Sequence, residues 1–415
     1  MTSKKSQLSV QLEAQEPKAK AIYVSSYIPR ECGIATFTKD LTSAINVLNP
    51  SLLADIVAID DHTVATPEKK IRSYPWEVKY KIHQEDLKCW LEAADYINQS
   101  GAEIVNIQHE FGLYGGKDGE YVIPFMERLK KPIVTTFHTI VPNPEGHYSE
   151  LTQRIVNLSS AVVVMVDTAA NWLIKTYGID PEKIVVIPHG VPDVSFGPTE
   201  VTKKKLGLKG EIIMGFGLIS SGKGYEHVIK AMPKIVKKHP NAKFLVLGQT
   251  HPVVLRYEGQ VYRNKLKKLV TDLKLKKNVI FVNKYLSLDE ITDYLKATDI
   301  YITPFSNLDQ ITSGTLSYAI GAGKACVSTP YLYAKEVIGD NKGLLIEPEN
   351  PTDIAKAINF LLDNPKKRHE FARNAYLAGR KMIWESVALK YLGLFDLVKE
   401  LKNAGNKISA KTENK

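Results

Sequence analysis

The 415-residue chain is poor in cysteine and has no apolar run long enough to cross a membrane. Cys32, Cys89 and Cys326 are far apart and odd in number, so neither a disulfide framework nor a zinc-binding spacing is present. The first twenty residues contain no apolar core of the kind that a signal peptide needs. These shortages predict a cytoplasmic protein whose two ends, residues 1–20 and 403–415, are disordered.

Three common signatures of nucleotide and metal sites are also missing. The chain has no Walker A sequence, no three-glycine dinucleotide fingerprint and no Asp-x-Asp pair. A phosphate site must therefore be built from shorter elements, and neither a metal nor another cofactor is expected.

The net charge is +10 and is carried mostly by lysine. Its densest segment, residues 263–277, has Leu266, Leu269, Val270 and Leu273 at helical spacing. We interpret this segment as a surface helix with a solvated lysine face, and peripheral contact with the anionic inner face of a membrane is the alternative. No basic motif studded with aromatic residues is present, so a nucleic-acid partner is not expected.

Apolar segments of strand length alternate with helical patterns along most of the chain, which is typical of α/β proteins with doubly wound parallel sheets. The 44% hydrophobic content is enough for two domains, and a proline- and glycine-rich segment, residues 189–198, separates two series of strands. The strands are expected at 21–26, 53–59, 104–108, 133–137, 161–166 and 184–187, then at 212–216, 244–247, 279–282, 300–303, 325–328 and 344–346, with the first helix at 37–48.

In the first series, polar residues follow the ends of several strands. The first strand leads into a loop that contains Arg30 and Gly33, which suits the binding of a phosphate or carboxylate. Later strands end near His109, Glu110 and His138. Packed histidines and a plain turn would explain each residue alone, but several at equivalent strand ends favour a ligand site.

The second series begins with the same arrangement of strand, glycine-rich loop and helix. Its loop, residues 217–224, contains Lys223, which can neutralise a diphosphate as a point charge. Farther along, Ser313, Gly314 and Thr315 open a helix, where unpaired backbone N–H groups attract anions. A surface lysine and an ordinary helix cap remain the alternatives when each feature is considered alone.

Six motifs together resemble the family 4 glycosyltransferases of the GT-B fold, most closely their bacterial mannosyltransferase-like branch. The resemblance covers roughly residues 21–401. The motifs are YIPRECGIATFTKDL (27–41), NIQHEFGLYGG (106–116), TTFHT (135–139), VIPHGVP (186–192), GFGLISSGKGYE (215–226) and SGTLSYAIGAGKACVSTPY (313–331). Each motif is weak alone, and the set is specific for the superfamily.

The resemblance implies two facing Rossmann-like domains, an acceptor-side domain at 21–196 and a donor-binding domain at 197–380. A helix at 381–402 would return to the first domain. Gly33 would lie near the donor phosphates and His138 beside the donor sugar, while Lys223 would meet the diphosphate. The remaining implied site residues are Gly224, Gln310, Ser313, Gly314, Thr315 and Tyr318 for the donor, and Arg30, His109 and Glu110 for the acceptor.

The chain departs from the family pattern at three positions. Leu218 stands where the family usually has an arginine beside the glycine. Gln310 and Tyr318 stand where it usually has two glutamates that contact the donor sugar and the ribose. An amide can still bond to a hydroxyl, and a tyrosine ring can stack, so donor recognition is expected to differ in detail.

The function that the resemblance implies is retaining transfer of a hexose, with mannose from GDP-mannose as the first expectation, to a glycan or lipid-linked hydroxyl. His138 and Lys223 would serve the transfer, with Glu110 orienting the acceptor. Two alternatives remain: a phosphate-dependent glycoside phosphorylase on the same fold, and a non-catalytic module that binds sugar nucleotides or glycans. Phosphorolysis would identify the former, and binding without turnover the latter. The sequence does not determine the oligomeric state.

Overall fold

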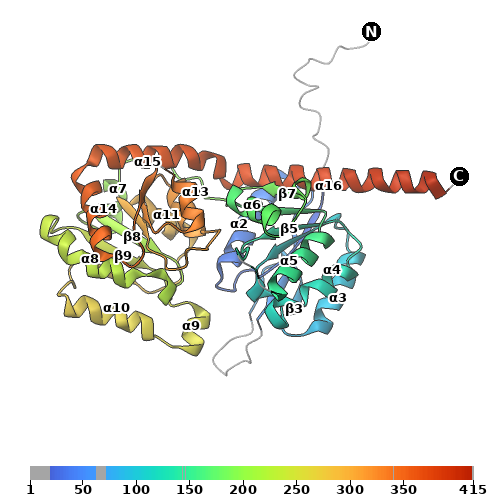
Figure 1. The fold of residues 1–415 in the computed structure, drawn as a ribbon, viewed down its shortest axis with the longest axis horizontal. Coiled ribbons are helices and arrows are strands. Elements are labelled where there is room, and N and C mark those ends of the chain that lie inside the picture. Colours follow the sequence, from blue (N-terminus) through green and yellow to red (C-terminus); the bar gives the residue numbers. More distant parts are fainter. Residues whose placement is uncertain (1–18, 62–71, 143, 145, 340, 414–415) are drawn as a thin grey trace, which may run out of the picture. The chain divides into compact units, whose positions relative to one another are not determined.

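The computed structural model describes residues 19–61, 72–142, 144, 146–339 and 341–413, which form two compact units (Figure 1). The first unit contains the described residues up to Val164, together with 170–187 and 385–413, and the second contains 165–169 and 188–384. The main segment of the second unit thus begins at Pro188, whereas the sequence predicts the boundary after residue 196. The tail predicted at 1–20 lies outside the described residues except for its last two.

The first unit is built on a parallel sheet with the strand order β3-β2-β1-β4-β5-β6-β7. Its strands are β1 (Ala21–Ser25), β2 (Asp55–Asp60), β3 (Val78–His83), β4 (Ile104–His109), β5 (Ile133–Phe137), β6 (Ala161–Val164) and β7 (Ile184–Val186). The sequence pattern does not predict β3. This edge strand exposes Lys79 and Lys81 and buries only one side chain fully, so its apolar signal is weak.

The second unit has a parallel sheet with the order β10-β9-β8-β11-β12-β13. Its strands are β8 (Ile212–Phe216), β9 (Lys243–Leu247), β10 (Val279–Val282), β11 (Ile300–Thr303), β12 (Ala325–Ser328) and β13 (Gly343–Leu345). Because both sheets are parallel and doubly wound, the predicted fold class is confirmed.

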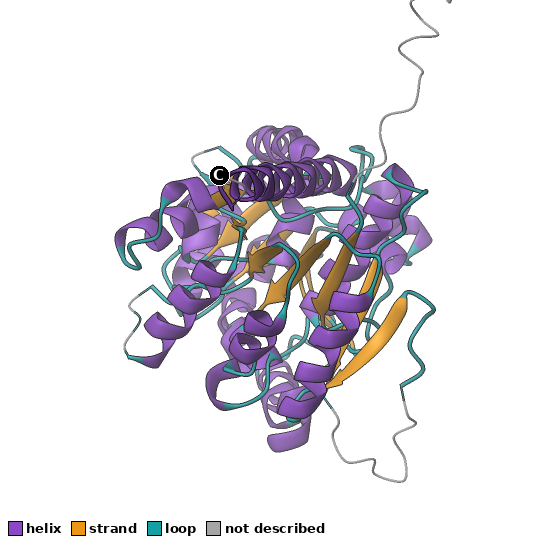
Figure 2. Ribbon diagram, turned by 90° about the vertical axis from the view of Figure 1, so that its right-hand side faces the viewer, coloured by secondary structure: helices purple, strands orange, loops and turns teal. Residues whose placement is uncertain are grey.

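Helices cover both faces of the strands (Figure 2). The longer ones are α2 (Gly33–Leu48), α3 (Leu87–Gln99), α5 (His147–Leu158), α8 (Tyr225–Lys238), α10 (Val261–Asp272), α14 (Pro351–Asp363), α15 (Pro365–Gly379) and α16 (Trp384–Glu413). The shorter ones are α4 (Val122–Arg128), α6 (Asp167–Lys175), α7 (Glu200–Lys205), α9 (Pro252–Tyr257), α11 (Leu288–Lys296), α12 (Gly314–Gly321) and α13 (Leu332–Ile338).

The first helix, α2, begins at Gly33 and not at residue 37 as predicted. Glycine and threonine are weak helix formers, so the sequence pattern predicts a helix only from Phe37 onward. In the structure Ala35 and Phe37 are both buried, and this packing stabilises the extra turn. The correction matters because it puts Gly33 at a helix N-terminus.

Residues 263–272 of the lysine-rich segment lie in α10, and the lysines of this helix are exposed as expected. The first cation of the segment, Arg263, is buried. Arg263 is only 2% exposed, and its guanidinium donates to the carbonyl of Gly248 at 2.6 Å and to the hydroxyl of Thr250 at 3.1 Å. Arg263 therefore fastens the helix to the loop after β9, a contact that helical spacing alone does not reveal.

The last helix, α16, packs on the first unit through its apolar side. The Tyr391 hydroxyl lies 3.0 Å from that of Thr136, and the Phe395 ring meets the Tyr23 ring at 6.2 Å. The helix continues to Glu413, which corrects the prediction of a disordered tail from residue 403. Once a helix is nucleated, each added residue gains a backbone hydrogen bond, and no proline interrupts this stretch.

Candidate functional site

Both sheets have a switch point where the strand order reverses, between β1 and β4 in the first unit and between β8 and β11 in the second. In open α/β sheets, ligands bind beyond the carboxyl ends of the strands at such a point. The loops that follow these four strands carry most of the predicted site residues, so each unit has a candidate half-site of its own.

In the first unit, the loop after β1 holds Arg30 and leads to Gly33. The Arg30 guanidinium donates to the carbonyl of Ile59 at 3.2 Å and to the side-chain oxygen of Gln84 at 3.3 Å, and lies 3.6 Å from Asp61. These contacts tie the loop to the ends of β2 and β3. The structure therefore gives the Arg30 guanidinium partners within its own unit, and its role on the acceptor side stays a prediction.

Gly33 is the first residue of α2, and no side chain caps the helix at its N-cap residue Cys32. A Cβ atom added to Gly33 would meet no atom within 4 Å. The packing described inside this unit therefore does not require glycine here. A side-chain-free helix start with open space beside it is a suitable place for an anion.

His138 follows β5 and is 9% exposed. Its backbone N–H donates to the carbonyl of His109 at 3.0 Å, and its Nε2 lies 2.8 Å from the side-chain oxygen of Gln108. Its ring meets the Phe37 ring of α2 edge to face, with the two ring centroids 4.9 Å apart and an angle of 90° between the ring planes. The imidazole is thus held by the first helix and by the neighbouring strand.

Glu110 lies one residue beyond β4, and its carboxylate accepts a hydrogen bond of 2.5 Å from the hydroxyl of Thr139. Burial raises the pKa of the Glu110 carboxyl above its ordinary value, while hydrogen bonds from Thr139 and the backbone of Phe111 oppose the rise. The structure thus brings Glu110 next to the residue that follows His138.

His109 does not belong to this half-site, which corrects the prediction. Its ring is 0% exposed and lies among Phe111, Tyr114 and Phe137, at centroid distances of 4.9, 5.4 and 5.1 Å. Neither ring nitrogen has a hydrogen-bond partner among the described residues, and burial lowers the pKa of His109 to about 3. Neighbouring side chains on a strand point to opposite faces, so position at a strand end does not fix orientation.

Replacing His109 by phenylalanine should leave the free energy of unfolding equal or raise it by up to about 2 kcal/mol, because it removes two buried, unpaired nitrogens. Urea unfolding would measure the change. Transfer activity, assayed in parallel, should persist. If the His109→Phe protein folds but has lost its activity, His109 acts on the acceptor side after all.

In the second unit, the loop after β8 brings three predicted elements together at Gly217. A Cβ atom on Gly217, whose φ is +128°, would lie 3.3 Å from Cγ2 of Thr315 and 3.6 Å from Nζ of Lys223. The lysine comes from the loop after β8, and the threonine comes from the first turn of α12, after β11. The switch point therefore collects an ammonium group, a helix N-terminus and a bare glycine.

The Lys223 ammonium group lies 4.2 Å from the centroid of the Phe305 ring, a cation–π contact. No salt bridge to it occurs among the described residues. Burial lowers the pKa of Lys223 to about 8, and its charge adds to burial in lowering the pKa of His251. The sequence gave no signal for Phe305 or His251, because neither lies in a glycine-rich motif.

Gly224 links the lysine loop to α8 and has a φ of +64°. A Cβ atom there would lie 2.1 Å from the carbonyl oxygen of Pro304, in the loop after β11. The close approach of these two loops places Lys223 beside Phe305, so Gly224 shapes the site through its missing side chain.

The start of α12 is capped by Ser313, whose hydroxyl accepts from the N–H of Leu316 at 3.3 Å. Gly314 leaves room for His189, because a Cβ atom on it would lie 2.9 Å from Nε2 of that histidine. The His189 Nδ1 lies 2.7 Å from the carbonyl of Gly190, which requires a proton on Nδ1 and makes Nε2 an acceptor. Burial lowers the pKa of His189 to about 4, so its ring is neutral near pH 7.

Gln310 and Tyr318 flank this helix start differently. The Gln310 amide donates to the carbonyl of Thr312 at 2.6 Å, which orders the loop that leads to α12. Tyr318 is 6% exposed, and its ring faces those of His189 and Phe216. Because so little of the Tyr318 ring is exposed, the ring mainly packs against these two neighbours.

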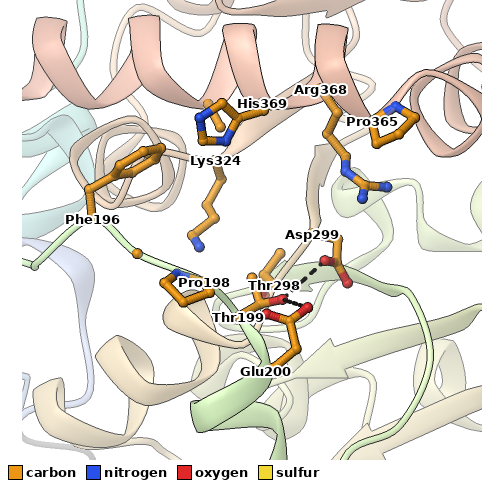
Figure 3. Close-up of a pocket in the computed structure, with 13 residues that line it drawn as sticks. Phe196, Pro198, Thr199, Glu200, Thr298, Asp299, Lys324, Pro365, Arg368 and His369 are labelled. Atoms are coloured by element: carbon orange, nitrogen blue, oxygen red, sulfur yellow. Dashed lines mark hydrogen bonds between the residues drawn. The ribbon is translucent and has the colours of Figure 1, made fainter.

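A cavity of about 240 Å³ opens at the other end of the second sheet (Figure 3). Asp299 immediately precedes β11 and Lys324 immediately precedes β12, so the cavity lies at the amino ends of the strands. Its charges are mixed: Lys324 and Arg368 face it together with Asp299, and Asp299 is 2.6 Å from Lys203. This cavity is distinct from the switch point and lacks a single ligand chemistry.

Within the part of the chain that the structure describes, no three His, Cys, Asp or Glu side chains are grouped so that they could hold a metal ion. None of the helices found among the same residues combines the length and the apolar character needed to span a membrane.

Family models match both units. A model described as Glycosyl transferases group 1 matches residues 198–378, and one described as Glycosyltransferase Family 4 matches residues 57–194. Together they cover both halves of the candidate site except the loop around Gly33.

Among curated relatives, the D-inositol 3-phosphate glycosyltransferase of Kineococcus radiotolerans is 24% identical over 290 residues, and that of Acidothermus cellulolyticus is 27% identical over 304 residues. These matches cover 63% and 67% of this chain, and they span 65% of the length of each relative.

Two solved structures share the fold over most of the chain. Sucrose-phosphate synthase from Thermosynechococcus elongatus has a TM-score of 0.74 at 16% identity and covers 93% of this chain and 100% of its own. Anabaena HepE in complex with UDP and glucose has a TM-score of 0.68 at 16% identity, with coverages of 90% and 99%.

Proposed function

Because this chain belongs to the family 4 glycosyltransferases and has their GT-B fold, we propose that it moves a hexose from a nucleotide diphosphate sugar to an acceptor hydroxyl with retention of configuration. The acceptor is a glycan or a lipid-linked sugar. The observation that carries the proposal is the meeting of Lys223 and the start of α12 at Gly217. This arrangement offers a positive charge and unpaired N–H groups to one anion.

Catalysis by this site requires stabilisation of the negative charge that grows on the departing diphosphate. Lys223 supplies a full charge that is partly removed from water, and the N-terminus of α12 supplies oriented backbone N–H groups. Such preorganised groups gain strength where water is excluded. Lys223 and the α12 N-terminus therefore stabilise the leaving group, and the protein needs no covalent nucleophile.

Retention follows if the acceptor attacks the face that the diphosphate leaves. The bond between the anomeric carbon and the diphosphate oxygen breaks, and a bond from the acceptor oxygen to the same carbon forms. The proton of the acceptor hydroxyl passes to an oxygen of the departing diphosphate. In the first unit, Gly33 would face donor phosphates, His138 would contact the sugar, and Glu110 would orient an acceptor hydroxyl.

Two observations suggest which donor the protein uses. The resemblance of the motifs favours GDP-mannose, while the structure of HepE holds UDP and glucose. The three residues that differ from the family pattern lie in the second unit, where the nucleotide would bind: Leu218, Gln310 and Tyr318. UDP- and GDP-hexoses are therefore the candidates to compare, with the protein acting in the cytoplasm or at the inner membrane face.

A thermal-shift titration with GDP-mannose, UDP-glucose, UDP-N-acetylglucosamine, ADP-glucose and phosphate tests the proposal. A donor at 100 times its dissociation constant should add about 2.7 kcal/mol to the stability of the unit that binds it. Turnover of that donor with a glycan acceptor supports transfer. Binding without any turnover would favour a non-catalytic module, and phosphorolysis of oligosaccharides without nucleotide binding would identify a phosphorylase.

Diphosphate binding should depend on pH through Lys223. Because the pKa of Lys223 is lowered to about 8, the free protein loses this charge as the pH rises through that value. The affinity for UDP or GDP should therefore fall about tenfold for each pH unit above it. Calorimetric titrations from pH 6.5 to 9.5 measure this slope, and Lys223→Met should abolish it. An equal slope in both proteins would assign the pH dependence to another group.

A further inference from the structure

Three polar side chains form a buried row beside the sheet of the first unit. The Asn106 side-chain nitrogen lies 3.0 Å from the carbonyl of Val134, and its oxygen lies 2.6 Å from the Gln108 side-chain nitrogen. The Gln108 side-chain oxygen lies 2.8 Å from Nε2 of His138. Asn106 and Gln108 are both 0% exposed, so no water competes for these groups.

The direction of each hydrogen bond in this row follows from its fixed end. The Val134 carbonyl only accepts, so Asn106 must turn its NH₂ group toward it. The Asn106 oxygen is then an acceptor and requires the NH₂ group of Gln108. This leaves the Gln108 oxygen facing His138, and an oxygen of this kind can only accept. The His138 Nε2 must therefore carry a proton.

We propose that Asn106 and Gln108 are positioning residues that hold His138 in the Nε2–H tautomer, so that Nδ1 is the accepting nitrogen of the ring. Reversing the row would turn the Gln108 NH₂ group toward Nε2, which would then have to accept, but it would also bring the Asn106 oxygen against the Val134 carbonyl, where two acceptors meet. A buried polar network is stable only when all its members are satisfied, so one direction and one tautomer prevail.

This assignment narrows what His138 can do in transfer, and here it rests on the proposed function. A neutral histidine with its proton on Nε2 presents Nδ1 as a hydrogen-bond acceptor. It suits a sugar hydroxyl that donates, and it does not suit a group that only accepts, such as a phosphate oxygen. His138 is thereby matched to a hydroxyl of the substrate and not to the diphosphate.

The test is nitrogen-15 NMR of the free, histidine-labelled protein near pH 7.5, with His138→Gln used to assign the signal. The expected spectrum has a protonated Nε2 and an unprotonated Nδ1 for His138. Gln108→Met removes the accepting oxygen at similar volume and should give a mixture of tautomers. Asn106→Leu, which frees the Gln108 amide to turn, should do the same.

The matched control is Thr135→Val, on the neighbouring strand β5. It breaks the buried 2.8 Å hydrogen bond between the hydroxyls of Thr135 and Ser159. It should lower stability yet leave the His138 spectrum unchanged. In transfer assays, Gln108→Met should lower kcat by about 10- to 100-fold, the range found when groups that orient a ligating histidine are lost.

A wild-type spectrum with the proton on Nδ1, or a pure Nε2–H signal in Gln108→Met, would overturn the tautomer proposal. Because the NMR measurement uses no substrate, it separates this proposal from the proposed function. A confirmed tautomer without any transferase activity would remove only the catalytic use of His138. If Gln108→Met does not fold, the wild-type spectrum and Asn106→Leu still decide the question.

Discussion

Lys223→Met is expected to lower turnover by about 10²- to 10³-fold, the loss seen when a group that stabilises transition-state charge is removed. Methionine keeps much of the length of the side chain and can remain on the Phe305 ring, so only the charge is lost. The fall should appear in kcat with donor saturating, because the charge on the leaving diphosphate grows in the transition state. Steady-state kinetics with the donor found by titration measures the effect.

The same substitution should not destabilise the free protein near pH 7. The folded-state pKa of Lys223 is lowered from 10.5 to about 8, so holding the ammonium group charged costs stability below that pH. This cost is relieved as the pH rises from the folded toward the unfolded pKa, and methionine removes it at all pH values. Lys268→Met, on the exposed face of α10, is the control and should change neither turnover nor stability. Unchanged turnover in Lys223→Met would remove this lysine from the mechanism.

Gly224→Ala is expected to lower the free energy of unfolding by about 2–5 kcal/mol. A left-handed conformation costs a residue other than glycine about 1–2 kcal/mol, and forcing a methyl group into filled space adds about 1–3 kcal/mol. Here the added Cβ would stand 2.1 Å from the Pro304 carbonyl oxygen. The two loops must separate to admit it, so donor binding should weaken even where the protein stays folded.

Gly222→Ala is the matched control, two residues earlier in the same loop. Its added Cβ would have only the Ser306 hydroxyl within 4 Å, at 3.9 Å, and its φ lies outside the left-handed region. Its stability should therefore change by less than about 1 kcal/mol. Urea unfolding of both variants, followed by donor titration, distinguishes the two positions. Equal losses would mean that the loop tolerates no side chain at all, and that the contact with Pro304 has no special part.

The sequence was informative wherever one segment carries its own physical signal. Fully buried strands such as Ile212–Phe216 and Ile300–Thr303 are short apolar runs, and their ends matched the structure. The loop with Lys223 and the helix start at Ser313 were found for the same reason, since glycine, a cation and a capping hydroxyl are local features. The edge strand Val78–His83 was missed because exposed lysines interrupt its pattern.

Orientation was the part that local pattern could not supply. His109 and His138 both stand at strand ends in the sequence, but the former is enclosed by three aromatic rings and the latter is held by Gln108. Arg30 stands in a loop that suits an anion by its sequence, but its guanidinium is held by groups at the ends of β2 and β3. Each of these differences depends on partners that are distant in the chain.

By itself the sequence determined the fold class, the family resemblance and the segments that carry the site, because strand runs, glycine-rich loops and helix caps are encoded locally. Only the tertiary structure decided which groups meet: Lys223 with Thr315 at Gly217, and His138 with the Asn106–Gln108 row. The reason is that the parallel strand order sets which loops lie side by side, while burial and hydrogen-bond partners set charge and tautomer.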